Sequence, residues 1–250
     1  MEIDRYIVEL QDLGGRLATA AAAADLEARV PTCPGWTVRD LLRHVGGVHR
    51  WATAYVCSGK SEPTSDEEEA VFFVAVPNDG LLSWYRAGHA SLVTALRDAD
   101  PGMSCWTFLP APSPRAFWAR RQAHETAIHC VDAEAAVEWP SRLPGDFAAD
   151  GIDELLNGFF ARPNGCLTAD TPVTLSIQTT DTGHAWTIRV ESDRRVVSSG
   201  FTRADCTLVG PASDLYLLLW NRRELGPPVD ITGDGRVMDL WRARATIRWG

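Results

Sequence analysis

The chain has 250 residues, of which 45% are hydrophobic and 23% charged, and its formal net charge is −9. This length allows one large domain or two ordinary ones, with a substantial buried core. The acidic balance argues against a nucleic-acid partner, because no surplus of cations is available to neutralise phosphates. No apolar run approaches the roughly 20 residues that span a bilayer, and the N-terminus lacks the basic and apolar segments of a signal peptide. We expect a cytoplasmic protein, either a monomer or a homodimer, without a membrane partner.

The first part of the chain has the 3.6-residue periodicity of helices. Thr37 and Asp40 form the pattern of a capping box and predict the start of a helix that runs to about Tyr55. Pro114 suits the first turn of a later helix. The acidic run 66–69 lies in a segment, 58–79, that we expect to be a solvated or poorly ordered loop without a partner. The predicted long helices, which together indicate a four-helix bundle, cover residues 2–28, 38–55, 80–97 and 114–138, and a short helix follows over 146–162.

The pattern changes after Gly165, where apolar residues alternate with period two. The predicted strands cover residues 173–178, 186–190, 195–199 and 205–210, and helices follow from Pro211 to about 223 and over 236–243. Strands followed by helices, separate from an all-helical part, indicate a second domain. The expected fold class is therefore α+β, with a helical bundle over 1–160 and a small α+β domain over 165–250 that has a mainly antiparallel sheet.

Several common functional motifs are missing from the sequence. Its six cysteines (33, 57, 105, 130, 166 and 206) include no Cys-x-x-Cys pair, which excludes a zinc ribbon and a thioredoxin-like site and favours free thiols. There is no Gly-x-Ser-x-Gly elbow, no phosphate-binding glycine loop and no dinucleotide fingerprint. Hydrolase, kinase and dinucleotide-dependent functions therefore receive no support.

Glu125 and His129 stand four residues apart on the predicted helix 114–138, so their side chains leave the same face one turn apart. A carboxylate and an imidazole so placed can share a divalent metal ion, but a third ligand must come from elsewhere. The predicted helix that follows Thr37 offers two histidines, His44 and His49. They are five residues apart and cannot both face one point, and helical periodicity does not choose between them.

The same spacing has a simpler interpretation. Arg121, Glu125, His129 and Asp132 form one polar stripe, which can be a solvated helix face laced by ion pairs. His124 falls toward the apolar side of this helix and is expected to be a hydrogen-bonded structural histidine. A lone histidine on a half-apolar face, such as His44 or His49, is also often a satisfied core residue.

Three segments resemble the actinobacterial mycothiol-dependent maleylpyruvate isomerase family. They read VPTCPGWTVRDLLRHV over residues 30–45, RQAHETAIHCVDAE over 121–134 and ADGIDELL over 149–156. The resemblance covers nearly the whole chain and implies a DinB-like metal-binding bundle followed by a domain similar to sterol-carrier proteins. It also implies that His44, Glu125 and His129 bind a metal, zinc or another divalent ion.

A site with two histidines and one glutamate leaves a zinc position open, as catalytic zinc sites do. A thiol that enters such a position would lose its proton at neutral pH. The resemblance identifies mycothiol as the thiol cosubstrate and a small electrophile as the second substrate. The predicted function is a zinc-dependent, mycothiol-using isomerase or thiol S-transferase. The alternative is a non-catalytic module that binds a small hydrophobic ligand and carries a structural or vestigial metal site.

Arg222 and Arg223 are the candidate catalytic residues of the second domain, since adjacent guanidinium groups can bind a substrate carboxylate. They can equally be surface arginines favourably placed at a helix C-terminus. Trp36, Trp51 and Trp118 are candidates to line a pocket, although most tryptophans belong to the core.

Overall fold

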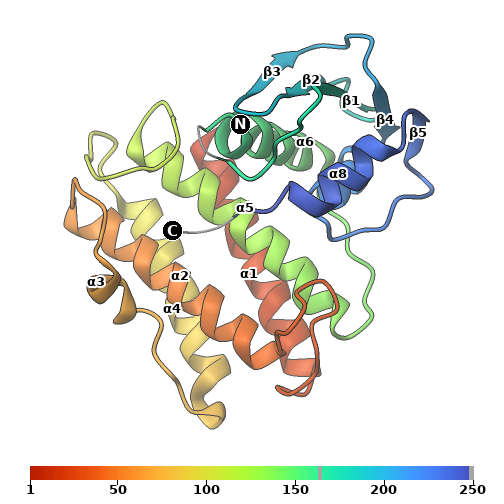
Figure 1. Cartoon of the computed structure of the whole chain (residues 1–250). Coiled ribbons are helices and arrows are strands. Elements are labelled where there is room, and N and C mark those ends of the chain that lie inside the picture. The colour runs from red at the N-terminus through yellow and green to blue at the C-terminus, as the bar shows by residue number, and fades with distance from the viewer. Residues whose placement is uncertain (163–164, 248–250) are drawn as a thin grey trace. The chain divides into compact units, whose positions relative to one another are not determined.

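The computed structural model describes residues 1–162 and 165–247, which form two compact units, Met1–Ser141 and Arg142–Gly250 (Figure 1). We predicted the boundary between the two domains between residues 160 and 165. The units divide earlier because the short helix α6 (Gly145–Asp153) packs against α7 (Ala212–Leu219) and so belongs with the second unit.

The first unit is the predicted four-helix bundle. Its long helices are α1 (Ile3–Ala23), α2 (Val38–Ser58), α4 (Asn78–Asp98) and α5 (Pro114–Ala135). α1 and α2 each pack against both α4 and α5, as the helices of the bundle show in Figure 1. Apolar residues at helical spacing, such as Leu10, Leu13 and Leu17 on α1, are fully buried between them. No helix in the described part of the chain is long and apolar enough to cross a membrane.

The signals for helix starts in the bundle act as predicted. The Thr37 hydroxyl accepts a hydrogen bond from the Asp40 amide (3.3 Å), and the Asp40 carboxylate accepts one from the Thr37 amide (2.9 Å). Hydrogen bonds from Thr37 hold the pKa of the Asp40 carboxyl below its usual value. Pro114 occupies the first turn of α5 after the Ser113 cap. α1 ends at Ala23, earlier than predicted, because Ala24 adopts an extended conformation.

The expectation of a solvated loop over 58–79 is wrong for part of that segment. Residues Asp66–Ala70 form a short helix, α3. Its start is a second capping box, in which the Glu68 carboxylate accepts from the Ser65 amide (2.8 Å) and the Ser65 hydroxyl accepts from the Glu68 amide (3.3 Å). The four acidic residues in its first turn interact favourably with the positive end of the helix dipole. The acidic run therefore stabilises this helix.

The second unit contains a five-stranded sheet in the order β3-β2-β1-β4-β5. The strands are β1 (Val173–Thr179), β2 (Ala185–Val190), β3 (Arg195–Ser199), β4 (Cys206–Gly210) and β5 (Asp230–Gly233). Only β1 and β4 pair in parallel, so the mainly antiparallel α+β fold is as predicted. α7 packs against β4 and β1, and α8 (Arg236–Arg244) packs against β1.

Two features of this unit differ from the prediction. The helix expected over 146–162 is α6 followed by a π-helix, η1 (Glu154–Phe160). β5 was missed because its last residue, Gly233, resembles a loop glycine. Gly233 has a positive φ of 89°, and a Cβ there would lie 2.2 Å from the Asp205 carbonyl oxygen, so close strand pairing requires a glycine.

The absence of a side chain at Gly14 on α1 makes room for the ring of His89 on α4. A Cβ on Gly14 would lie 2.1 Å from His89 Nε2, which donates a hydrogen bond to the Leu10 carbonyl oxygen (2.9 Å). The neighbouring Gly15 is exposed, and a Cβ there would meet nothing within 4 Å. Packing therefore requires a glycine at position 14, whereas it does not require one at position 15.

We expect Gly14→Ala to lower the free energy of unfolding by about 1–3 kcal/mol, because the added methyl must displace the His89 ring. Gly15→Ala is the matched control and should raise it by up to about 1 kcal/mol through helix propensity. Chemical denaturation of both variants measures the difference. Equal effects of the two substitutions would contradict this account of Gly14.

Candidate metal centre

The polar stripe of α5 is buried inside the bundle. Arg121 is 1% exposed, Glu125 4%, His129 8% and Asp132 0%. The interpretation of this stripe as a solvated helix face is therefore wrong. Burying an ionisable group costs free energy unless the group has a partner. The partners of these four side chains therefore indicate the role of this part of the bundle.

Three donor atoms converge where α2 meets α5. His44 Nε2 and His129 Nε2 each lie 3.3 Å from Glu125 Oε1. One ligand atom from each of the three residues lies within 4.8 Å of the others. The side chain of His44 is 23% exposed, whereas those of Glu125 and His129 are 6% and 10% exposed, so the cluster opens on the His44 side.

These separations fit the coordination of a small divalent cation. Two atoms that each lie about 2.0–2.1 Å from one tetrahedral zinc ion are about 3.3–3.4 Å apart. The two Nε2–Oε1 distances match this value. Two imidazole nitrogens and one carboxylate oxygen are also a donor set that zinc accepts, with a fourth position left open.

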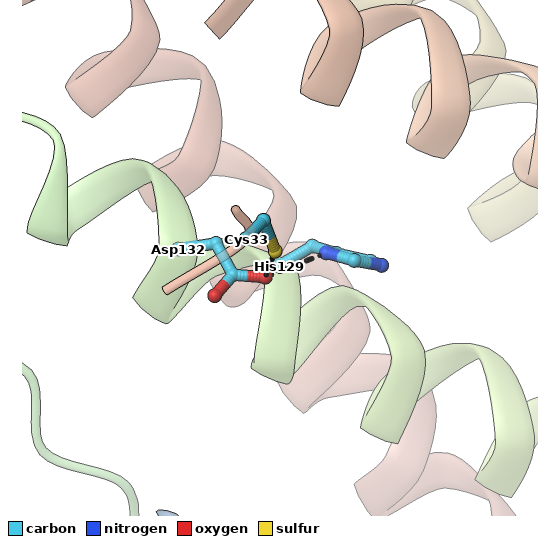
Figure 2. Close-up of side chains that lie close together, drawn as sticks. All are labelled: Cys33, His129 and Asp132. Carbon is cyan, nitrogen blue, oxygen red and sulfur yellow. Dashed lines mark hydrogen bonds and ion pairs between the residues drawn. The ribbon is translucent and has the colours of Figure 1, made fainter. Parts of the chain in front are cut away.

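Asp132 holds the His129 ring from behind (Figure 2). Its Oδ2 lies 2.8 Å from His129 Nδ1, and since a carboxylate only accepts, Nδ1 carries the hydrogen and donates. This leaves His129 Nε2 directed at Glu125. Asp132 also accepts from the Cys33 thiol at Oδ2 (3.2 Å) and from the Thr32 hydroxyl at Oδ1 (2.5 Å). A carboxylate behind a histidine is the usual support of a metal ligand.

Arg121 supports the carboxylate ligand in the same way. Its Nη2 donates to Glu125 Oε2 (3.2 Å), which leaves Oε1 for the two histidines. Burial alone would raise the pKa of the Glu125 carboxyl. Hydrogen bonds from His129 and His44 and the charges of His129 and Arg121 outweigh burial and hold this pKa well below its usual value. Glu125 is therefore ionised and able to bind a cation.

The pKa of His129 is shifted upward by its acidic neighbours. Burial would lower it, but the hydrogen bonds to Asp132, Cys33 and Glu125 and the charge of Glu125 raise it well above its usual value. The protein thus places strong negative potential at His129 Nε2. A proton or a metal cation satisfies this potential, and the two compete for the same lone pair.

The loop before α2 brings its own side chains to the cluster. Its backbone closes through hydrogen bonds from the Val30 amide to the Trp36 carbonyl (3.0 Å) and from the Trp36 amide to the Cys33 carbonyl (3.0 Å). Gly35 allows the turn with a φ of 91°. The Trp36 ring then stacks on the His129 ring, with centroids 6.0 Å apart, and meets the edge of His44 at 5.0 Å.

Other candidate residues lie outside this cluster. His49 is fully buried and contacts Thr126 Oγ1 (2.9 Å), and His124 is fully buried beside the Tyr6 ring. Both are thus core residues. The expectation of a satisfied core histidine is met only in part at His49, because its Nδ1 has no hydrogen-bond partner among the described residues. Trp51 and Trp118 belong to a buried aromatic cluster with Tyr55, and of the three tryptophans considered only Trp36 touches the centre.

Arg222 and Arg223 lie in the second unit, just after α7, and are half-buried. Arg222 Nη1 donates to the Trp220 carbonyl oxygen (3.0 Å), and Arg223 forms an ion pair with Asp214 in the first turn of α7. Arg223 therefore has a structural contact within its own unit.

Reasoning from the sequence missed the supporting residues of the centre. Asp132 was noted only as part of a polar stripe, although its position three residues after His129 was a usable signal. Thr32 was noted only within the segment 30–45 that carries the family resemblance, and Cys33 only there and as one of the six cysteines. Their role depends on how the loop before α2 folds against α5, which no local pattern reveals.

The fold and the cluster together define a two-domain α+β protein whose helical bundle brings together side chains that could hold a metal ion. A model of the mycothiol maleylpyruvate isomerase N-terminal domain matches residues 9–134, and a model of the C-terminal domain of the same enzymes matches residues 146–240. The chain belongs to the mycothiol-dependent maleylpyruvate isomerase family.

Solved structures agree with this assignment at the level of the fold. The crystal structure of the mycothiol-dependent maleylpyruvate isomerase aligns with a TM-score of 0.64 and 13% identity, covering 93% of each chain. A histidine-to-alanine mutant of the mycothiol-dependent maleylpyruvate isomerase aligns with a TM-score of 0.61 and 12% identity, covering 87% of this chain and 88% of the other. A comparison with curated proteins gave no match.

The buried His49 generates a prediction about acid stability. Burial, with the nearby His89, lowers the pKa of His49 well below its usual value. The unfolded chain therefore binds a proton at His49 at a pH where the folded chain does not, and stability is lost as pH falls below about 6.5.

We expect His49→Asn to flatten this acid loss of stability in metal-free protein. Relative to the variant, the wild type should lose up to about 1.4 kcal/mol per pH unit as pH falls from about 6.5. Denaturant titrations over this pH range give the difference. His184→Asn, at an exposed histidine, is the control and should leave the slope unchanged. Parallel pH profiles for wild type and His49→Asn would rule out this role of His49.

Proposed function

We propose that this chain is a metal-dependent, mycothiol-using isomerase or S-transferase of small electrophiles, with zinc held by His44, Glu125 and His129. The observation that carries the proposal is the convergence of two Nε2 atoms on Glu125 Oε1 at the separation expected for ligands of one ion. Family membership supports the thiol and the isomerase class. Another divalent ion with the same ligand preference is compatible with this site.

A cation bound here would lower the pKa of an incoming thiol, so that a thiolate is available at neutral pH. The residues of the chain prepare the site for it. Asp132 fixes the His129 tautomer, Arg121 holds the second carboxylate oxygen of Glu125, and the opening beside His44 admits the thiol. All three contributions exist before any substrate binds, so the site needs little reorganisation.

The thiolate then has two chemical outcomes. Addition to one carbon of an activated double bond leaves a single bond that can rotate, and expulsion of the same thiolate restores the double bond in the other geometry. Protonation of the neighbouring carbon instead of expulsion gives a stable thioether. The first outcome is isomerisation and regenerates the thiol, whereas the second is transfer and consumes it.

The two units have separate roles in this proposal. The DinB-like bundle binds the metal and the thiol. In the sterol-carrier-like unit, Arg222 and Arg223 are the candidate residues for binding a carboxylate. We place the reaction in the cytoplasm, because the thiol must be reduced.

The arginine role has its own test. We expect Arg222→Ala to raise KM for a carboxylate-bearing electrophile by roughly 10- to 100-fold, the effect of losing one charge-assisted hydrogen bond. The KM for the methyl ester of the same compound should not change. Arg203→Ala, at an exposed arginine of the same unit, serves as the control. A KM for the acid that is unaffected in both Arg222→Ala and Arg223→Ala would remove these residues from the catalytic set.

A graded set of variants tests the metal centre. Zinc titration of wild-type protein should show one ion per chain, with affinity that falls as pH drops because protons compete for the imidazoles. Asp132→Asn should weaken zinc binding by roughly 10–100-fold, as loss of an outer partner does, and His44→Ala should weaken it further. Asp79→Asn, at an exposed aspartate, should have no effect.

Activity is measured in the same samples. Mycothiol-dependent consumption or isomerisation of electrophiles should stop on chelation, return with zinc, and be lost in His44→Ala. Unchanged zinc stoichiometry and affinity in His44→Ala would refute the metal assignment. Ligand binding without turnover, unaffected by chelation, would favour the alternative of a non-catalytic module for a small hydrophobic ligand.

A further inference from the structure

An exposed apolar segment follows α3. Residues 71–76 read VFFVAV and contain no charged or polar side chain. Val71 is 64% exposed, Phe73 43% and Val74 46%, so three large apolar residues face solvent within four positions. Such a concentration of exposed apolar surface is unusual unless it contacts a ligand or a partner.

This segment is attached to α2 directly beside the metal centre. The Phe73 ring stacks on the His44 ring, with centroids 6.3 Å apart and planes 30° from parallel. The ring fits over Gly47, where a Cβ would lie 2.5 Å from Phe73 Cδ1. The end of the segment is tied to α2 by Arg43 Nη2, which donates to the Val76 carbonyl oxygen (2.7 Å). Phe73 thus has a defined seat although almost half of it is exposed.

Trp36 provides a second aromatic surface at the same histidine. Its ring meets His44 at 5.0 Å and an interplanar angle of 62°, and it stacks on His129. His44 is therefore in contact with two aromatic rings, one from the loop before α2 and one from the segment after α3. His44 is also the most exposed of the three donor residues, so these rings lie where the centre opens.

An apolar surface at the opening favours one class of substrate. A charged or strongly hydrated group placed against the faces of the Phe73 and Trp36 rings would lose water without gaining a polar partner from them. An alkyl or aryl group there gains the free energy of leaving water, and an aryl group adds stacking on an aromatic ring. The site thus discriminates by the apolar portion of the electrophile.

We propose that Trp36 and Phe73 form an apolar acceptor wall beside His44, and that the electrophile of this chain carries an alkyl or aryl substituent next to its reacting double bond. This inference rests on the proposed thiol-dependent function. The reaction of such a substrate is addition of the thiolate sulfur to the β-carbon of an unsaturated carbonyl compound. The electron pair of the double bond moves toward the carbonyl oxygen, and the α-carbon then takes a proton from water.

The test uses unsaturated aldehydes that share one reacting centre and differ in chain length, namely butenal, hexenal and octenal. With mycothiol and zinc-loaded full-length protein, kcat/KM corrected for the uncatalysed reaction should rise roughly two- to fourfold for each added methylene. Phe73→Ala should remove most of this dependence, and Phe73→Leu should restore it. Trp139→Ala, an aromatic residue of equal exposure elsewhere in the bundle (44%), should behave as wild type.

A binding measurement separates this inference from the proposed function. Butanol, hexanol and octanol, which cannot react with a thiol, are titrated against zinc-loaded and metal-free protein by ligand-observed NMR. Affinity should rise with chain length in wild type and Trp139→Ala, and the rise should be lost in Phe73→Ala. Circular dichroism and zinc stoichiometry establish that Phe73→Ala is folded and loaded.

The outcomes are distinct. Turnover that is independent of chain length, or a dependence that survives Phe73→Ala, overturns the acceptor wall and leaves the thiol-dependent function intact. If no aldehyde is turned over, the alcohol titration alone decides the wall, and the zinc and electrophile assays described above decide the proposed function. Equal chain-length dependence in wild type and Phe73→Ala in that titration overturns the wall.

Discussion

The burial of four ionisable side chains on one face of α5 is the constraint on which the bundle depends. Arg121, Glu125, His129 and Asp132 cannot be buried without partners. Within α5, Arg121 pairs with Glu125, and His129 contacts both Glu125 and Asp132. Further contacts come from elsewhere in the chain. α2 supplies His44, and the loop before it supplies donors to Asp132. The position of α2 against α5 is thus determined by polar contacts as well as by apolar ones, and the same contacts create the donor cluster.

Local chemistry made much of the fold predictable. The Thr37–Asp40 capping box and Pro114 marked two helix starts, and the change of period near Gly165 marked the strands. The short helix α3 was not predicted, because an acidic run is typical both of a solvated loop and of the first turn of a helix. The choice of His44 over His49 came from resemblance, since helical periodicity allowed both. Periodicity also could not show that Asp132 is buried, because a polar stripe has the same sequence pattern on a solvent-exposed helix face and on a buried one.

The centre has two layers of different chemistry. Behind the donor atoms lie Arg121 and Asp132, which are buried. Arg121 binds the Glu125 carboxylate, and Asp132 orients the His129 ring. In front lie the rings of Trp36 and Phe73, which supply apolar surface. In the proposed function, the inner layer determines which ion and protonation state the site favours, and the outer layer determines which substrate groups bind beside it. A substitution in one layer is therefore expected to change metal affinity, and one in the other to change substrate preference.

The two segments that bring aromatic rings to the centre differ in how freely they could be redesigned. The loop over 30–36 contributes a ring and two donors to Asp132, and Thr37, which follows directly, caps α2. Altering it disturbs folding, ligand orientation and access together. The segment over 71–76 contacts the centre through Phe73, and its end is held by a hydrogen bond from Arg43. Its start is held by hydrogen bonds from the Phe72 and Phe73 amides to carbonyl oxygens of α3. The segment could therefore be exchanged as a unit, which would change the apolar surface beside His44 and leave His44, Glu125 and His129 in place.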